Sequence, residues 1–286
     1  MTTTITLLVD NQAQEGLKHE HGLSLFIEHQ GKRILFDNGQ NEALFFNAEK
    51  LNISLNNLDM IILSHGHYDH GGNLAALLLA NPKALFYAHP DCKNIRYSLH
   101  PNKPARTISL SKEALAAIDA IPPAQCHFIT HATEVLPRLW LTGEIPRVSN
   151  IEDTGGPFFL DPEGKQADCL NDDMSLWIET NAGLTVICGC CHSGIVNTLN
   201  HIKKQTRETK PIKTLLGGLH LVGADQRRLN YTLEYLSNQG IEKLYPAHCT
   251  GENAMNLLKE IFETRTEIAM AGLKITLSSQ SKTKTL

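Results

Sequence analysis

The stretch from Ser64 to Gly72 reads SHGHYDHGG and places three histidines and one aspartate within six residues. It follows an apolar segment, 58–63, that is typical of a buried strand, and precedes a leucine-rich segment, 73–80, that is typical of a helix. The polar side chains therefore lie on a loop at the carboxyl end of a strand, where a rigid scaffold can hold them. Imidazoles and carboxylates are ligands of Zn²⁺ and its first-row neighbours, so this loop predicts a metal site.

Three later segments repeat this arrangement, in which an apolar strand leads to a histidine. They reach His192, His220 and His248, and a helical pattern follows each of them. Ser193 is the predicted N-cap of the first of these helices. The two glycines at 217 and 218 indicate that another group approaches the backbone closely before His220. We expect all four strand ends to lie at one edge of a sheet, with their histidines converging there.

Strands alternate with amphipathic helices along the 286 residues, a length sufficient for one large domain. This pattern predicts an α/β (α+β) fold, a four-layer αββα sandwich in which two mixed sheets pack face to face with helices outside. We expect a single domain over 1–286. The proline-punctuated segment of about 90–140 is predicted to be an insertion, or lid, that covers the active site.

Three charged residues outside the histidine segments leave alternatives open. Arg96 and Arg106, in the predicted insertion, are candidate contacts for an anion, although solvated surface charge is the favoured interpretation. Asp37, at the end of the predicted strand 32–37, either contacts the metal ligands from behind or caps the N–H groups of a turn, and the sequence favours neither.

Composition excludes several classes of partner. The formal net charge is −4 and no long basic run occurs, which argues against nucleic acid as a partner. No apolar stretch approaches the length of a membrane span, and the start at Met1 to Thr4 lacks the basic residues of a secretory signal. We therefore expect a cytoplasmic protein without a membrane partner. Seven cysteines, an odd number, indicate free thiols rather than a complete disulfide framework.

The motif His-x-His-x-Asp-His after an apolar strand resembles the signature of the metallo-β-lactamase-fold superfamily. The resemblance implies that His65 and His67 bind a first metal ion, and that Asp69 and His70 bind a second. With the later histidines, the expected metal ligands are His65, His67, Asp69, His70, His192 and His248. One or two divalent ions are expected, with zinc as the first choice and iron or manganese as alternatives.

Further phrases narrow the resemblance, and they extend over nearly the whole chain. Among them, the nonapeptide GCCHSGIVN begins at Gly189 and HCTG begins at His248. These phrases resemble the group named for the archaeal 7,8-dihydropterin-6-methyl-4-(β-D-ribofuranosyl)-aminobenzene-5′-phosphate synthase. In most of the superfamily, a Gly-Asp at a later strand end supplies a carboxylate that bridges both metals. Here Cys190 occupies a comparable place, and Cys190, His220 or no bridge at all remain open.

The resemblance implies an enzyme, a metal-dependent hydrolase or transferase. A metal-activated water would act on a phosphorylated or anionic small molecule, and the resemblance points to a synthase-like reaction. Asp69 and His220 are the predicted catalytic residues, His220 being either an extra ligand or a donor to the substrate oxyanion. Arg147 is the predicted substrate contact, because its guanidinium can fix a phosphate.

Two alternative functions remain open at this point. One is an enzyme that hydrolyses a thioester or a lactone. The other is a sensor that binds metal without turnover, and here cysteines beside the histidines make a redox-responsive site conceivable. The cysteines concerned are Cys188, Cys190, Cys191 and Cys249. The favoured interpretation of these four is that they are small buried hydrophobic residues on strand ends.

Overall fold

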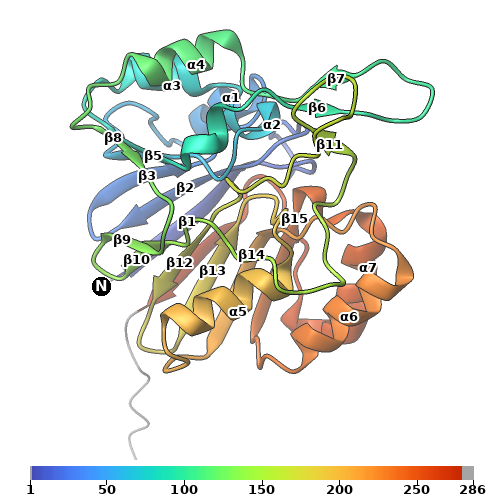
Figure 1. The fold of residues 1–286 in the computed structure, drawn as a ribbon. Coiled ribbons are helices and arrows are strands. Elements are labelled where there is room, and N and C mark those ends of the chain that lie inside the picture. The colour runs from blue at the N-terminus through green and yellow to red at the C-terminus, as the bar shows by residue number, and fades with distance from the viewer. Residues whose placement is uncertain (1, 279–286) are drawn as a thin grey trace, which may run out of the picture.

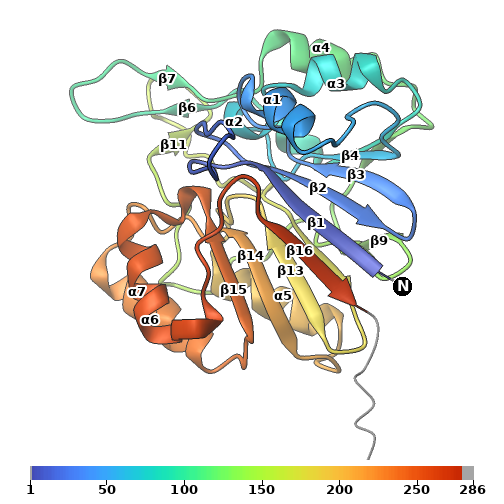
Figure 2. The same ribbon diagram turned by 180° about the vertical axis from the view of Figure 1, so that it is seen from behind.

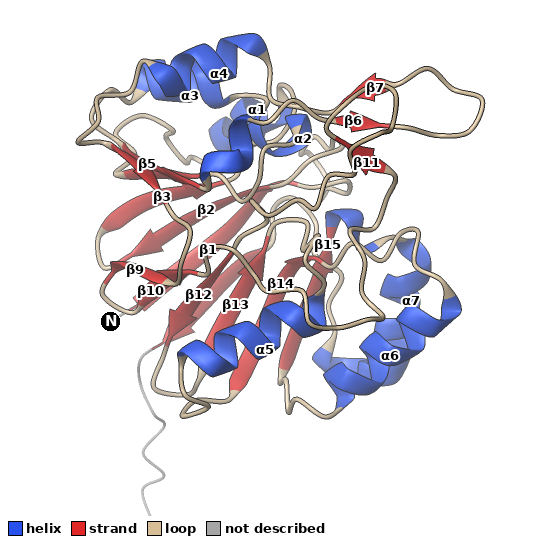
Figure 3. Ribbon diagram, viewed as in Figure 1, coloured by secondary structure: helices blue, strands red, loops and turns tan. Residues whose placement is uncertain are grey.

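The computed structural model describes residues 2–278, and these form four layers (Figure 1). Two β-sheets pack face to face, and helices cover the outer face of each sheet, as the views from the opposite side and by secondary structure also show (Figures 2 and 3). The predicted αββα sandwich is thus confirmed. The ends of the predicted domain, Met1 and 279–286, lie outside the described residues.

The first sheet has seven strands, and both antiparallel and parallel pairs occur in it. The order across the sheet is β16 (Lys274–Ser278), β1 (Thr2–Val9), β2 (Ser24–His29), β3 (Lys32–Phe36), β4 (Met60–Ile62), β5 (Leu85–Ala88) and β8 (Cys126–Phe128). The predicted hairpin is formed by β2 and β3, and from β3 to β8 the neighbouring strands run parallel.

The second sheet has six strands and is also mixed. Its order is β15 (Lys243–Ala247), β14 (Ile212–Gly218), β13 (Leu184–Cys188), β12 (Ser175–Glu179), β10 (Leu139–Leu141) and β9 (Thr133–Leu136). Strands β13, β14 and β15 run parallel, so their carboxyl ends meet at one edge of the sheet. A third, antiparallel sheet of three short strands lies beside that edge, and it consists of β11 (Phe158–Phe159), β6 (Tyr97–Ser98) and β7 (Arg106–Thr107).

Helices cover the two outer faces of the sandwich. The first sheet carries α1 (Ala43–Lys50), α3 (Leu74–Ala80) and α4 (Lys112–Asp119), and the second carries α5 (Ile195–Gln205), α6 (Gln226–Ser237) and α7 (Glu252–Phe262). The remaining helical turns are α2 (Tyr68–Gly71), η1 (Pro90–Lys93), η2 (His248–Thr250) and η3 (Glu263–Arg265). Within residues 2–278, none of the helices combines the length and apolar character needed to cross a membrane.

The hydrophobic core follows from the period of two along each strand. On β2, Leu25 and Ile27 face the second sheet, whereas Phe26 between them packs under the helices of the first sheet. All three are buried, and each such side chain stabilises the fold by about 1.5–3 kcal/mol relative to exposure. Both faces of each sheet are therefore covered, which leaves the strand ends as the places where polar side chains can gather.

The predicted insertion at about 90–140 is distributed over the sandwich. Strand β8 extends the first sheet, β9 and β10 extend the second, and α4 covers the first. Only the part with β6 and β7 projects beside the strand ends (Figure 1). A covering role for this smaller part stays a prediction.

The start of α5 differs from the prediction that Ser193 is its N-cap. The N-cap position of the helix is Gly194, and no side chain at that position caps the helix. Glu152, from a distant loop, instead accepts hydrogen bonds from the backbone N–H groups of Val196 (2.9 Å) and Asn197 (2.8 Å). A carboxylate at the helix N-terminus satisfies these free donors, so Ser193 is not needed there.

Candidate metal centre

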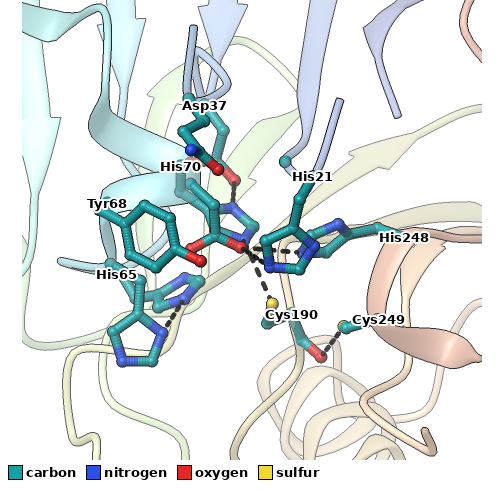
Figure 4. A network of polar contacts seen from close by, with 12 residues as sticks. His21, Asp37, His65, Tyr68, His70, Cys190, His248 and Cys249 are labelled. Carbon is teal, nitrogen blue, oxygen red and sulfur yellow. Dashed lines mark hydrogen bonds and ion pairs between the residues drawn. The ribbon is translucent and has the colours of Figure 1, made fainter. Parts of the chain in front are cut away.

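Residues from both sheets meet at the edge where the parallel strands end. The loop after β4 carries His65 and His67, and α2 directly follows it. The turns after β13, β14 and β15 carry His192, His220 and His248. Strand β4 belongs to the first sheet and β13, β14 and β15 belong to the second, so the expectation that all four strand ends lie at one edge of a single sheet is wrong. The carboxyl ends of strands from the two facing sheets meet instead, and residues far apart in sequence lie side by side (Figure 4).

The predicted metal-ligating histidines form one buried cluster. The ring centroids of His65 and His192 lie 4.9 Å apart, and those of His70 and His248 lie 5.0 Å apart. His65 also lies 4.2 Å from His70, measured between ring centroids, which joins the two halves of the cluster. Asp69 Oδ2 lies 3.4 Å from His248 Nε2. The structure thus brings all six predicted ligands together.

Several ring nitrogens in the cluster are buried without a hydrogen bond, among the described residues. These are Nε2 of His67, Nε2 of His192, Nδ1 of His220 and Nε2 of His248. The other nitrogen of His192 is held, because Nδ1 donates to the carbonyl of Thr154 at 2.8 Å. Burying an unpaired polar atom costs about 1–3 kcal/mol, and a metal ion would remove that cost. The donor set therefore fits a divalent metal.

Burial also sets the ionisation of these histidines. It lowers the pKa of His65, His67 and His192 well below the usual range of histidine. For His65 and His192, neighbouring histidines lower the pKa further. Neutral imidazoles carry the free lone pair that a metal ligand needs.

Asp37 lies behind the cluster and has both of its predicted roles, since it contacts a predicted ligand and accepts a hydrogen bond from a backbone N–H. Its carboxylate accepts hydrogen bonds from the backbone N–H of Ser64 at 2.7 Å and from His70 Nδ1 at 2.7 Å. Burial lowers the pKa of His70, but the carboxylates of Asp37 and Asp69 outweigh it and raise this pKa to about 9. Asp37 thereby fixes the ring orientation of a predicted ligand, as partners of metal-bound histidines commonly do.

His21 is a residue of the site that the sequence pattern does not predict. Its Nε2 lies 3.1 Å from Asp69 Oδ2, and its ring centroid lies 5.1 Å from that of His248. Burial raises the pKa of Asp69, but His70, His21 and His248 outweigh it and hold this pKa well below the usual range. No strand end leads to His21 as one leads to His192, His220 and His248, so the local pattern that predicts those ligands does not include it.

Arg96 is neither a surface charge nor an anion contact, so both of its interpretations are wrong. Its side chain is fully buried and donates to Asp172 through Nη1 (2.8 Å) and Nη2 (2.7 Å), and to Asp168 through Nε (2.7 Å). Asp172 also accepts a hydrogen bond from the backbone N–H of Gly66 at 2.7 Å. The ion pair thus holds the loop between His65 and His67.

Arg147 lies away from the cavity at the cluster. Its Nη1 donates to the carbonyl of His192 at 2.5 Å, and its Nη2 donates to the carbonyl of Leu170 at 3.1 Å. The guanidinium is therefore occupied by backbone carbonyls and supports the turn that carries His192. This geometry offers no free donor pair toward the cavity for a phosphate.

His220 lies in the cavity at the cluster, where the sequence places it. Its ring centroid lies 4.2 Å from that of His192, and its backbone has a positive φ of 44°. A Cβ added at Gly218 would lie 2.6 Å from Cys249 Sγ, so a side-chain sulfur does approach the backbone there. Burial lowers the pKa of His220, but Cys249 outweighs it and raises this pKa.

The four cysteines near the histidines divide into two pairs. Cys188 and Cys191 are buried among apolar side chains on the outer face of the second sheet, as the favoured interpretation expects. Cys190 and Cys249 line the cavity, and Cys190 Sγ lies 3.1 Å from His70 Nε2 (Figure 4). All seven cysteines are free thiols.

A cavity of about 380 Å³ opens over the cluster. Arg106 is the only lysine or arginine among the described residues that line it. Its guanidinium lies 4.9 Å from the ring centroid of Tyr68, and its Nη2 donates to the Tyr68 hydroxyl at 2.7 Å. Phe158, from the small third sheet, borders the same space, 5.4 Å from His192 and from His67 between ring centroids.

Comparisons with known proteins bear on the family and the fold of this chain. A sequence model described as the Metallo-beta-lactamase superfamily matches residues 18–163. The 7,8-dihydropterin-6-methyl-4-(beta-D-ribofuranosyl)-aminobenzene-5'-phosphate synthase of Methanocaldococcus jannaschii is 32% identical over 263 residues, which are 88% of this chain and 88% of the relative. An uncharacterized protein of the same organism is 34% identical over 261 residues, 90% of this chain and 94% of the relative. The crystal structure of Tm1679, described as a metal-dependent hydrolase of the beta-lactamase superfamily, matches with a TM-score of 0.80 and 28% identity, covering 96% of this chain and 99% of that one.

Proposed function

Because the chain belongs to the metallo-beta-lactamase superfamily, we propose that it is a metal-dependent hydrolase or transferase acting on a phosphorylated or otherwise anionic small molecule. A divalent metal ion, when bound, lowers the pKa of water to about 7 and stabilises developing negative charge. Zinc is the proposed metal, with iron or manganese as alternatives. The residues proposed to hold one or two ions are His65, His67, Asp69, His70, His192 and His248.

The observation that carries the proposal is that one arginine side chain lines the cavity over the histidines. Arg106 lines this cavity, and a guanidinium binds carboxylates and phosphates through charge-assisted hydrogen bonds. Tyr68 and Phe158 add aromatic surface on either side. The name of the M. jannaschii synthase contains a dihydropterin, an aminobenzene and a 5'-phosphate, so an aromatic phosphorylated substrate is proposed for this chain too.

Two residues are proposed to act on the substrate and its protons. His220 faces the cavity with an unpaired Nδ1 and can donate a hydrogen bond to a substrate oxygen that becomes negative, which is worth about 10²–10³ in kcat. Asp69 is proposed to accept the proton that a nucleophilic water releases. His21, whose side chain is half exposed and touches Asp69, can pass that proton to solvent.

A thioester or lactone hydrolase is the second candidate, and the apolar part of the same cavity favours it. Ile108, Phe158, Val222 and Met255 line the wall and suit an acyl chain. An ester or thioester substrate with a carboxylate would still use Arg106. The substrate class therefore has to be measured.

The test is turnover by purified protein loaded with zinc, iron or manganese. We expect hydrolysis within a panel of phosphomonoesters and phosphodiesters, and a KM raised about tenfold to a hundredfold in Arg106→Met, since a hydrogen bond to a charged group contributes about 1.5–3 kcal/mol. Arg227→Met is the matched control, because Arg227 is exposed on α6 and does not line the cavity.

Two results would contradict the proposal. Turnover of thioesters or lactones alone would replace it by the second candidate. Metal-loaded protein that turns over no compound of the panel would favour a sensor instead.

A further inference from the structure

One thiol lies at the meeting point of the proposed ligand sets. Cys190 Sγ is within 4.8 Å of one ring nitrogen each of His65 and His192, and within the same distance of His70 and His248. Cys190 is buried and lines the cavity, so its sulfur faces the imidazoles. This placement joins the two halves of the histidine cluster.

The backbone turn after β13 makes Cys190 differ from its neighbour. Cys191 has a positive φ of 64°, and its Sγ lies 3.3 Å from Thr198 Oγ1 on α5, within the apolar layer outside the sheet. Cys190 points the other way, into the site (Figure 4). The two adjacent cysteines thus lie in different environments, and of these two only Cys190 is available to a metal.

The two histidine groups that share Cys190 contain no carboxylate. Most donors in the described groups that could hold a metal are imidazoles, and Asp69 is the one carboxylate among them, grouped with His21 and His248. Two divalent cations a few ångströms apart repel strongly in a buried site, and a shared anionic ligand reduces that repulsion. Cys190 Sγ is the donor atom that both histidine groups share.

We infer that the Cys190 thiolate is a metal ligand shared by the His65–His192 half and the His70–His248 half of the site. When metal binds, the thiol proton is released to solvent and the sulfur takes its place as a donor. A thiolate favours zinc and iron over magnesium and manganese, so the site selects a thiophilic metal. This inference rests on the proposed metal-dependent function but adds the ligand and the metal class.

Cys249 lies close to this centre and provides an internal comparison. Its Sγ is within 4.8 Å of Cys190 Sγ and of a ring nitrogen of His220, and it donates to the carbonyl of Cys190 at 3.4 Å. The groups that contain His65, His70 and His192 include Cys190 and not Cys249. Cys249 is therefore assigned to the support of the Cys190 turn.

The experiment uses Co²⁺ as the metal probe in the full-length protein. A cobalt-bound thiolate gives an intense charge-transfer absorption in the near ultraviolet, whereas imidazole and carboxylate ligands do not. We expect this band in the wild-type protein and in Cys191→Ser, the matched control. We expect the band to be lost in Cys190→Ser. The metal content of this variant, measured by elemental mass spectrometry of acid-digested protein, should be at least twofold lower than that of the wild type.

Each other outcome has a defined meaning. Cobalt bound without the band overturns the thiolate inference but leaves the proposed metal-dependent function standing, whereas no bound metal at all overturns both. Loss of the band in Cys249→Ser together with its retention in Cys190→Ser overturns the assignment to Cys190. If Cys190→Ser does not fold, X-ray absorption of the zinc-loaded wild type decides, since absence of a sulfur neighbour at zinc contradicts the inference.

Discussion

Replacing Arg96 by methionine is expected to destabilise the fold by about 3–5 kcal/mol, because it leaves buried carboxylates without their counter-charge. Asp172 is fully buried and Asp168 is 7% exposed. Arg96 satisfies them with three charged hydrogen bonds of 2.7–2.8 Å. Methionine keeps most of the apolar stem, so the change removes mainly the charge and the donors.

Urea denaturation in the presence of a chelator measures this loss of stability without a contribution from metal binding. Arg106→Met is the matched control, since Arg106 is exposed and stacks on Tyr68. An exposed contact of this kind contributes about 0.5–1 kcal/mol, so the control should lose no more than that. The slope of the transition should stay unchanged in both variants.

The loss of folding stability in Arg96→Met should increase as the pH rises. Burial raises the pKa of Asp172, and Arg96 counteracts this, so the variant has a still higher folded-state pKa. The folded variant then binds more protons than the unfolded chain above the unfolded pKa of about 4, and its stability falls as pH rises. The loss should be larger at pH 8 than at pH 5. A penalty below about 1 kcal/mol at pH 8, or one that does not change with pH, would refute the reasoning.

Three further outcomes concern the metal centre. His67→Ala and Asp69→Ala should each abolish turnover while leaving the far-ultraviolet circular dichroism unchanged, and wild-type turnover at normal metal content would contradict their roles. His220→Ala should lower metal content if His220 is a ligand, or lower kcat by about 10²–10³ at normal metal content if it is a donor, and a fully active, fully metallated variant would exclude both. Gly155→Ala should reduce kcat and displace His220, because a Cβ there would lie 1.9 Å from its ring; a crystal structure of an active variant with an unmoved ring would contradict this.

The sequence predicted the layers of the fold and the histidine cluster for one physical reason. Both depend on short-range patterns, namely the period of two along strands and histidines that follow apolar strands. Parallel strands then bring separate ends such as His192 and His248 to one edge, without any need to know the distance between them. These elements could therefore be anticipated from local segments alone.

The two arginines show what short-range patterns cannot give. Arg96 meets Asp168 and Asp172, which follow it by more than 70 residues, and nothing local distinguishes it from a surface charge. Arg147 looked like a phosphate contact, but its donors are used by the carbonyls of His192 and Leu170. In both cases the partner is fixed by the tertiary packing. The supporting groups of a site are for this reason harder to predict than its ligands.

The strands of both sheets hold residues of the site in strained backbone conformations. Asp37, His220 and His248 all have positive φ values, of 57°, 44° and 49°, at the ends of strands in both sheets. The backbone of a non-glycine residue in this conformation is strained, and such strain persists only where the surrounding structure enforces it. Here the enforcement comes from the buried strands behind each residue and from hydrogen bonds such as the one from the His248 N–H to Asp10 (2.7 Å). The buried strands and these hydrogen bonds therefore hold the candidate ligands in place.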